Sequence, residues 1–224
     1  MQGILKVWEY KEFLLKGTII TIEMAFGAAI IGFILGTIAG MARLSKNPII
    51  NGISSIYVTI IRGTPMLLQI IFIYVAVPQL FKGITGNSIS PDPVLSGIIG
   101  IGINSGAYMA EIVRAGIQSI DKGQMEAARS LGLSNAQAMR YIILPQAFYR
   151  VVPAFGNELI VLLKDTSLVS AIGARELMNS ARILGAKFYQ YAQFLIGAGL
   201  IYLSLTFIIS KLVAFVERRF GIND

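Results

Sequence analysis

Long apolar runs with few charges dominate the chain and most restrict what it can fold into. The 224 residues are 55% hydrophobic and only 14% charged, with a mean hydropathy of +0.70. One soluble domain of this length cannot bury that much apolar surface. Because a membrane-spanning helix needs about 20 mostly apolar residues, we predict an all-α polytopic membrane protein with about five transmembrane helices. The predicted spans are 19–41, 53–80, 94–117, 148–163 and 191–216.

We interpret residues 1–224 as a single integral membrane domain. Residues 1–16 mix apolar side chains with lysines and glutamates, which is typical of a helix lying in the membrane interface. The first apolar run is too long for a signal peptide and has no small-residue cleavage site after it. If residues 121–145 are cytoplasmic, Lys and Arg are in slight excess on the cytoplasmic side, which agrees with that topology but does not establish it.

The polar segment 121–145 has the pattern of two helices joined by a sharp turn. Each helix is expected to start at a capping residue followed three positions later by glutamine: Asp121 with Gln124, and Ser134 with Gln137. Gly132 lies between them, where a helix end often needs a left-handed residue. Pro145 is expected to separate this segment from the next apolar run.

The residue inventory excludes most enzyme chemistry. The absence of His and Cys excludes an imidazole base, a Ser-His nucleophile and the usual zinc sites, so we predict no catalytic and no metal-binding residues. No G-x-x-x-x-G-K-[ST] loop is present, so ATP must be split by a partner chain if it drives this protein. A membrane aspartyl protease would need two paired acids, and none of Glu111, Glu158 and Asp165 has such a sequence context.

The run Glu126-Ala127-Ala128, then three residues, Gly132, nine residues and Ile142-Ile143-Leu144-Pro145 resembles the EAA loop of ABC importer permeases at every fixed position. In that family the loop is a pair of short cytoplasmic helices that seats on the ATP-hydrolysing subunit. The resemblance implies that residues 121–145 are a cytoplasmic coupling loop. It also implies a set of ATPase-docking residues, namely Glu126, Ala127, Ala128 and Gly132.

Further blocks resemble the permeases of polar amino acid importers, the branch with five spans per subunit. These blocks are Arg62-Gly63-Thr64-Pro65, 103–108 leading to Glu111 and Arg114, Leu144-Pro145-Gln146-Ala147, and 164–168. The resemblance implies a subunit that moves a basic or polar amino acid across the prokaryotic plasma (inner) membrane by alternating access.

The same resemblance implies the partners. They are a second permease subunit in a homodimer or heterodimer, two cytoplasmic ATP-binding subunits and an extracellular or periplasmic solute-binding protein. ATP and Mg would be bound by the partner, so no cofactor is expected on this chain, and the partners include the lipid bilayer but no nucleic acid. The alternative is a secondary transporter or channel driven by an ion gradient, which would have no use for the 126–145 pattern.

Polar residues inside the predicted spans are the candidates for a substrate site. A carboxylate in the hydrocarbon region costs a few kcal/mol, so it should face a cavity or a partner. Helical spacing places Asn104, Tyr108 and Glu111 on one stripe of the third span, and Asp165 lies one heptad beyond Glu158. The predicted substrate-binding residues are Asn104, Tyr108, Glu111, Asn157, Glu158, Asp165 and Ser167.

Asp165-Thr166-Ser167 precedes an apolar run at 168–178 and predicts the N-terminus of a half-helix. Its N–H groups would bind a substrate carboxylate, while nearby acids would bind a cationic side chain, which indicates a basic amino acid. The alternative is that Glu111 pairs with Arg62 or Arg114, and Asp165 with Lys164, as structural ion pairs. Glu23, in the first span, is interpreted as a packing or interface residue.

Small residues and prolines predict how the spans pack and where they bend. Glycines at four-residue intervals indicate close helix packing; they are Gly32, Gly36 and Gly40 in the first span, and Gly102 and Gly106 in the third. Pro65, and Pro153 with Gly156, are expected to interrupt the second and fourth spans.

Overall fold

The computed structural model of the protein describes residues 2–219, with side chains from residue 6, and every regular element in this part is a helix. The α-helices are α1 (Gln2–Glu9), α2 (Lys11–Ala42), α3 (Pro48–Arg62), α4 (Met66–Ile71), α5 (Val77–Thr85), α6 (Pro93–Gln118), α7 (Lys122–Ser130), α8 (Asn135–Ala138), α9 (Leu144–Asp165), α10 (Leu177–Phe188) and α11 (Tyr191–Arg219). Two π-helical turns, η1 (Phe72–Ala76) and η2 (Met139–Ile143), and one 3-10 helix, η3 (Thr166–Ile172), connect them.

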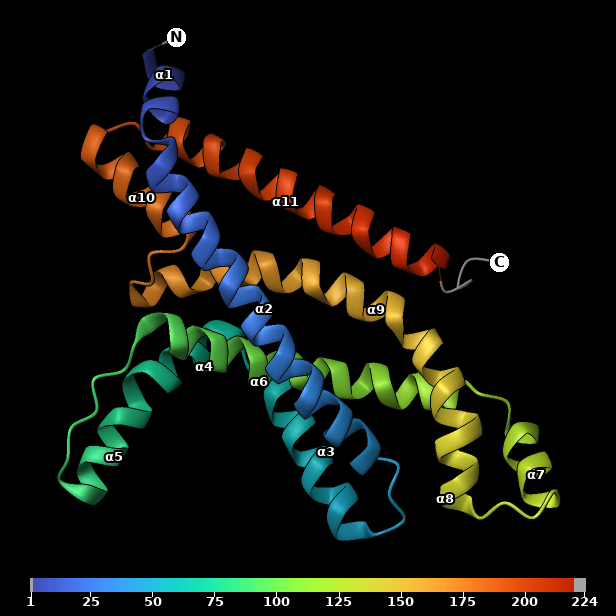
Figure 1. Ribbon diagram of the computed structural model, residues 1–224. Coiled ribbons are helices and arrows are strands. Elements are labelled where there is room, and N and C mark those ends of the chain that lie inside the picture. The colour runs from blue at the N-terminus through green and yellow to red at the C-terminus, as the bar shows by residue number, and fades with distance from the viewer. Residues whose placement is uncertain (1, 220–224) are drawn as a thin grey trace.

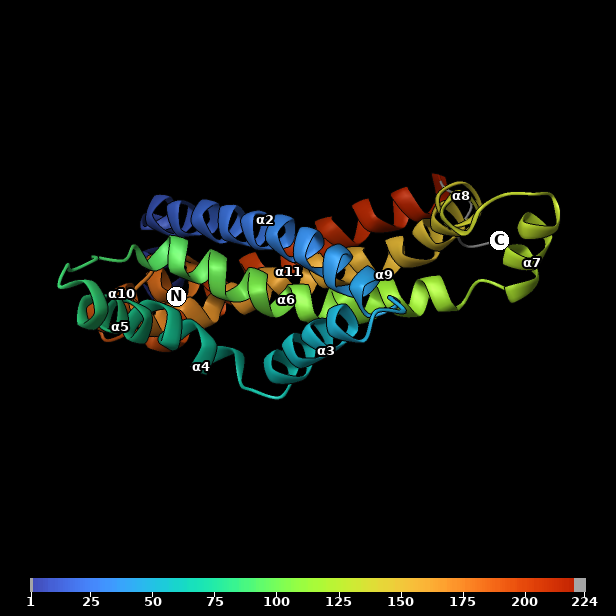
Figure 2. The ribbon, with the colours of Figure 1, turned by 90° about the horizontal axis from the view of Figure 1, so that it is seen from below.

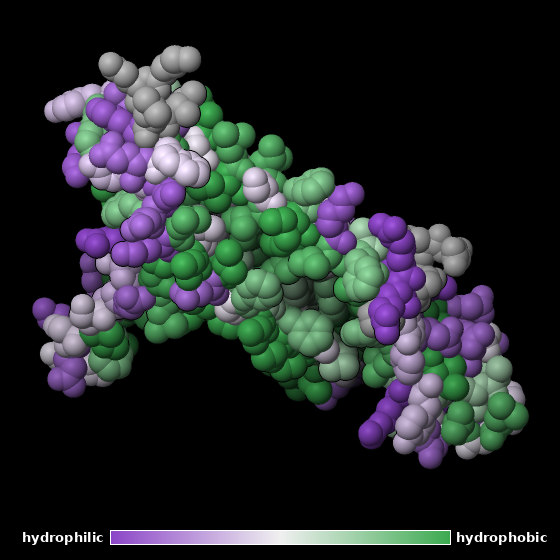
Figure 3. Space-filling model, turned by 45° about the horizontal axis from the view of Figure 1, so that its top comes forward, coloured by the Kyte–Doolittle hydropathy of each residue, from purple (hydrophilic) through white to green (hydrophobic). Residues whose placement is uncertain are grey.

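The long helices run between two ends of an elongated molecule (Figures 1 and 2). We call them the α7 end, which holds α7 and α8, and the α10 end, which holds α1, α5 and α10. Helices α2 and α6 run toward the α7 end, the α3–α5 segment and α9 run away from it, and α11 returns to it. On the face shown in Figure 3, hydrophobic residues cover the middle, and hydrophilic residues gather toward the ends. This distribution is that of a multi-pass membrane protein.

Within residues 2–219, four helical segments are long and apolar enough to cross a membrane: Lys11–Ala42, Met66–Thr85, Pro93–Gln118 and Tyr191–Arg219. The predicted all-α polytopic fold is therefore confirmed. The predicted span 53–80 is not one helix, because α3 ends at Arg62 and Pro65 caps the start of α4. The predicted span 148–163 lies within α9, a more polar helix that packs against α2, α6 and α11. Pro153 lies inside α9 without ending it.

Helices α2 and α6 pack closely because glycine leaves no side chain between them. A Cβ atom added at Gly36 would lie 2.4 Å from the Cβ of Met109, and one at Gly32 would lie 2.7 Å from the Ser105 hydroxyl oxygen. Both distances are too short for a non-bonded contact. The glycines of α2 therefore permit the backbones of α2 and α6 to approach closely. The predicted packing role of these glycines agrees with this geometry.

The polar segment 121–145 forms the predicted turn, with two differences at its ends. Gly132 has a φ of +86°, and Ser134 and Gln137 make the reciprocal capping bonds. Asp121 accepts from the Gly123 N–H at 2.6 Å, but the predicted back-bond from Gln124 is replaced by a contact between its side chain and Gln146. Pro145 does not separate two segments either. Helices α8, η2 and α9 follow one another without a break, because the π-helical turn accommodates the proline.

The buried carboxylate of Glu176 and the neighbouring N–H of Leu177 join α10 to α11 and α2. Glu176 is fully buried and caps α10, accepting from the N–H groups of Met178 and Asn179 at 2.7 and 2.6 Å. The Tyr202 hydroxyl of α11 donates to the same carboxylate at 3.0 Å, and the Leu177 N–H donates to the Thr21 hydroxyl of α2 at 3.1 Å. Burial raises the pKa of the Glu176 carboxyl above its ordinary value, while these hydrogen bonds act in the opposite direction.

The N-terminal segment 1–16 is not a single helix. Helix α1 ends at Glu9, and the residues from Lys11 onward already belong to α2. Trp8 is 70% exposed on α1, with the Lys11 ammonium 4.1 Å from its ring centroid. An exposed aromatic ring beside a lysine fits a position at the membrane interface.

Candidate functional site

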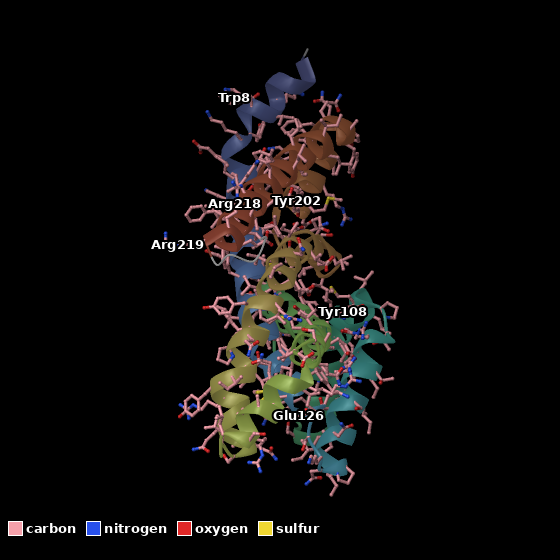
Figure 4. The ribbon with its side chains drawn as sticks, turned by 90° about the vertical axis from the view of Figure 1, so that its right-hand side faces the viewer. Trp8, Tyr108, Glu126, Tyr202, Arg218 and Arg219 are labelled. Carbon is pink, nitrogen blue, oxygen red and sulfur yellow. The ribbon has the colours of Figure 1, made fainter. Side chains whose placement is uncertain are left out.

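A polar cavity of ≈ 360 Å³ opens where α3 breaks, beside α6 and the last turns of α9. Its lining residues come from these three segments: Thr64, Pro65 and Met66; Asn104 and Tyr108; Glu158, Val161 and Asp165. Figure 4, viewed from the α7 end, places Tyr108 between α6 and the α3–α4 segment. The break between α3 and α4 exposes backbone that a continuous helix would satisfy internally, and such breaks in membrane helices occur where they line a cavity.

Gln69 of α4 holds the break in place. Its side-chain amide donates to the carbonyl oxygen of Ile61 at 2.8 Å and to the hydroxyl of Thr64 at 2.7 Å. Its carbonyl oxygen accepts from the amide of Asn104 at 3.0 Å. Gln69 therefore ties both sides of the break to α6 and fixes the orientation of Asn104. The sequence interpretation missed this residue, although an amide inside an apolar span is a signal that could have found it.

Two carboxyl groups from α9 face the cavity. Glu158 accepts a hydrogen bond from the Ser105 hydroxyl of α6 at 2.9 Å, and Asp165 lies two turns further along α9. No Lys or Arg is among the described residues that line the cavity. The site therefore offers oxygen acceptors and a negative potential, which suits a ligand with ammonium or guanidinium groups.

Four of the seven predicted substrate-binding residues line this cavity, whereas Asn157, Ser167 and Glu111 do not. Asn104, Tyr108, Glu158 and Asp165 line it. Asn157 is exposed on another side of α9, and Ser167 is half-buried in η3.

Glu111 is surrounded by arginines one turn along α6 from Tyr108. It pairs with Arg43, the C-cap residue that follows α2, with Arg62 at 3.5 Å and with Arg114 at 2.8 Å. The interpretation of Glu111 as a structural ion pair thus agrees with the geometry. We call these four residues the arginine cluster.

The predicted half-helix N-terminus at residues 165–167 is wrong. Helix α9 continues directly into η3, and the Thr166 N–H donates to the carbonyl oxygens of Leu162 and Lys164. The Thr166 hydroxyl donates to the Leu163 carbonyl oxygen at 2.8 Å and supports this continuous path. Because these groups are engaged within the helix, they offer no free N–H groups to a substrate carboxylate.

The predicted ATPase-docking residues lie together on and beside α7. Glu126 and Ala127 are exposed, Ala128 is buried, and Gly132 forms the turn that follows. Leu131 beside the turn is 84% exposed. Figure 4 shows Glu126 toward the lower part of this end, well away from Tyr108.

Comparison with known proteins gives matches over nearly the whole chain. Residues 32–222 match the family described as binding-protein-dependent transport system inner membrane component. The chain is 39% identical over 212 residues to the arginine transport system permease protein ArtQ of Bacillus subtilis, covering 95% of this chain and 94% of that protein. It is 36% identical over 216 residues to the glutamine transport system permease protein GlnP of Escherichia coli, covering 96% of each.

Solved structures agree with these matches. The chain superposes with a TM-score of 0.89 on an amino acid ABC transporter crystallised with histidines, at 39% identity, covering 96% of this chain and 98% of that one. The MetNI methionine ABC transporter in an inward-facing conformation gives a TM-score of 0.79 at 22% identity, covering 95% and 98%, which shows the shared fold. The chain belongs to the binding-protein-dependent transport system inner membrane components, as a permease subunit of the polar amino acid ABC importer branch.

Proposed function

We propose that this chain moves a basic or polar amino acid inward across a prokaryotic inner membrane by alternating access. It acts in a dimer of permease subunits, with two ATP-binding subunits at the α7 end and a solute-binding protein at the α10 end. The family description, which names a binding-protein-dependent transport system, supports the solute-binding partner. Motion of the ATPase pair passes through Glu126, Ala127, Ala128 and Gly132 to α9, because α7 packs against η2, which leads directly into α9.

The observation that carries the proposal is the cavity lined by Asn104, Tyr108, Glu158 and Asp165. Its volume suits one amino acid side chain and backbone, and its two carboxyl groups favour a cationic ligand. Arginine and glutamine are the substrates printed in the names of the two relatives above. A basic side chain would form ion pairs with these acids, whereas the uncharged amide of a glutamine side chain would only donate hydrogen bonds to them.

The two cavity acids provide the first test. Glu158→Gln and Asp165→Asn should each lower arginine uptake by about tenfold or more, because a hydrogen bond to a charged group contributes roughly 1.5–3 kcal/mol. Uptake into proteoliposomes that contain the assembled transporter is the measurement. Glu23→Gln is the matched control, since it removes an exposed carboxylate from α2 and should leave uptake unchanged. Unchanged uptake in both cavity variants would place selectivity wholly in the solute-binding protein.

The energy source provides the second test. Vesicles containing this chain alone should show no uptake. Vesicles that contain the chain with its ATP-binding subunits should accumulate substrate when ATP is inside, at the α7 end, and the binding protein is outside. The physical reason is the absence of a phosphate-binding loop from the sequence. Uptake by the chain alone under a proton or sodium gradient would make the secondary-transporter alternative correct.

A further inference from the structure

The arginine cluster carries more positive charge than its own carboxylate neutralises. Three guanidinium groups, from Arg43, Arg62 and Arg114, face the single carboxylate of Glu111 and leave a formal charge of +2. Their side chains are 21%, 42% and 31% exposed, so water screens the excess charge only in part. A second anion beside the cluster would therefore be stabilised.

Arg43 and Arg114 are already committed to partners within the cluster. Arg43 donates to one oxygen of Glu111, and Arg114 donates to the other at 2.8 Å. Arg114 also donates to the side-chain oxygen of Gln118 at 2.6 Å, on the side of α6 that leads toward the α7 end. These two arginines satisfy both carboxylate oxygens of Glu111 without help from Arg62.

Arg62 is the member of the cluster that borders the cavity. Its guanidinium carbon lies 5.1 Å from the ring centroid of Tyr108, and Tyr108 lines the cavity. Thr64, two residues further along the chain, lines it as well. Arg62 makes the longest of the three ion pairs with Glu111 and is the most exposed of the three arginines. Its guanidinium can therefore turn to a ligand while Glu111 stays paired.

We propose that Arg62 binds the α-carboxylate of the amino acid in the cavity, opposite Glu158 and Asp165. This inference rests on the proposed function and names the part of the substrate that the cavity acids cannot recognise. A planar guanidinium stacked on an aromatic ring is pre-organised for a carboxylate, which it binds through two parallel hydrogen bonds. The site then selects free amino acids over amines of the same side chain.

The charges around the cavity fix the orientation of such a ligand. Carboxyl groups from α9 form one side, and the positive cluster borders the Tyr108 side. A basic amino acid places its cationic groups toward α9 and its carboxylate toward Arg62. The engaged N–H groups at residues 165–167 offer no competing carboxylate site.

The test compares arginine with agmatine, which has the same guanidinium chain but no carboxylate. Binding is measured on the purified transporter, with its ATP-binding subunits and without the solute-binding protein, because that protein would impose its own selectivity. The wild type should bind arginine at least about tenfold more tightly than agmatine. Arg62→Gln should abolish that preference by weakening arginine binding, with agmatine binding changed by less than about twofold. Arg62→Lys, which keeps the charge but not the planar fork, should retain part of the preference.

Arg114→Gln is the matched control. It removes a guanidinium from the same cluster, so general destabilisation should affect both ligands equally and leave their ratio as in the wild type. Equal binding of arginine and agmatine by the wild type, or a preserved preference in Arg62→Gln, would overturn the role of Arg62 while leaving the proposed function intact. Failure of both ligands to bind, or arginine binding that is unchanged by Glu158→Gln, would instead contradict the proposed role of the cavity as the substrate site. If Arg62→Gln does not fold, the wild-type ratio and Arg62→Lys decide the question.

Discussion

Gly132→Val is expected to abolish uptake while the membrane bundle stays folded. Gly132 has a φ of +86°, a backbone conformation that a β-branched residue adopts only at a cost of about 1–2 kcal/mol or more. No atom lies within 4 Å of an added Cβ, so the penalty comes from the backbone and not from a clash. The turn would reopen to relieve the strain, and α7 would leave the position proposed for its contact with the ATPase.

The measurement is substrate-stimulated ATP hydrolysis together with uptake in proteoliposomes. Gly132→Asn is the matched control, because asparagine tolerates the left-handed region and should keep most of the transport. Both variants should show wild-type helix content and expression, since the turn lies outside the packed bundle. Normal uptake by a well-expressed Gly132→Val protein would contradict the assignment of this loop as the coupling element.

Glu111→Gln is expected to destabilise the bundle by about 2–3 kcal/mol, because it leaves three guanidinium groups facing one another without a carboxylate. The effect should fall below that of a fully buried pair, since the side chain of Glu111 is 22% exposed. The cluster joins α2, α3 and α6, so its loss should loosen the packing of all three helices. Unfolding by a denaturing detergent in mixed micelles measures the change.

The double variant Glu111→Gln with Arg43→Gln separates charge repulsion from lost packing. It removes one guanidinium together with the carboxylate and should recover part of the lost stability. A Glu111→Gln protein as stable as the wild type would show that water screens the cluster fully. The affinity of Glu111→Gln for arginine should fall by less than the loss in unfolding free energy would suggest, because the cavity acids and Arg62 are retained.

Local sequence patterns predicted the elements whose causes are local. The apolar runs predicted the long helices, and the Ser134–Gln137 pair and Gly132 predicted the turn within segment 121–145. The spacing of Asn104 and Tyr108 placed both on the cavity face of α6. In each case, residues a few positions apart determine the outcome.

The first residue of a helix was predicted less well where contacts with other buried helices determine it. Asp165 has the residue type that commonly caps a helix, yet the chain continues through it into η3. The cap of α10 is instead Glu176, a residue type outside the usual set. Its position depends on Tyr202 and Thr21, which come from other helices and are invisible to a local pattern.

The arginine cluster was out of reach for a similar reason. The pairing of Glu111 with Arg114 is visible within one helical turn, but Arg43 lies 68 residues away along the chain. Only the close approach of α2 to α6 brings them together. The sequence alone therefore could not decide whether Glu111 binds substrate or forms a structural ion pair. The tertiary packing distinguishes these two roles.

The Glu176 contact has a consequence for biosynthesis. The carboxylate lies on a segment that leaves the ribosome before α11, yet Tyr202 of α11 donates one of its hydrogen bonds. Thr21, which accepts from the N–H next to this cap, belongs to the first long helix to be made. Helices α2 and α11 thus both contact the start of α10. This set of hydrogen bonds can form only after α11 has been synthesised. A chain released early would leave an acidic group and the start of α10 open to water, where a protease can distinguish an incomplete product from a complete one.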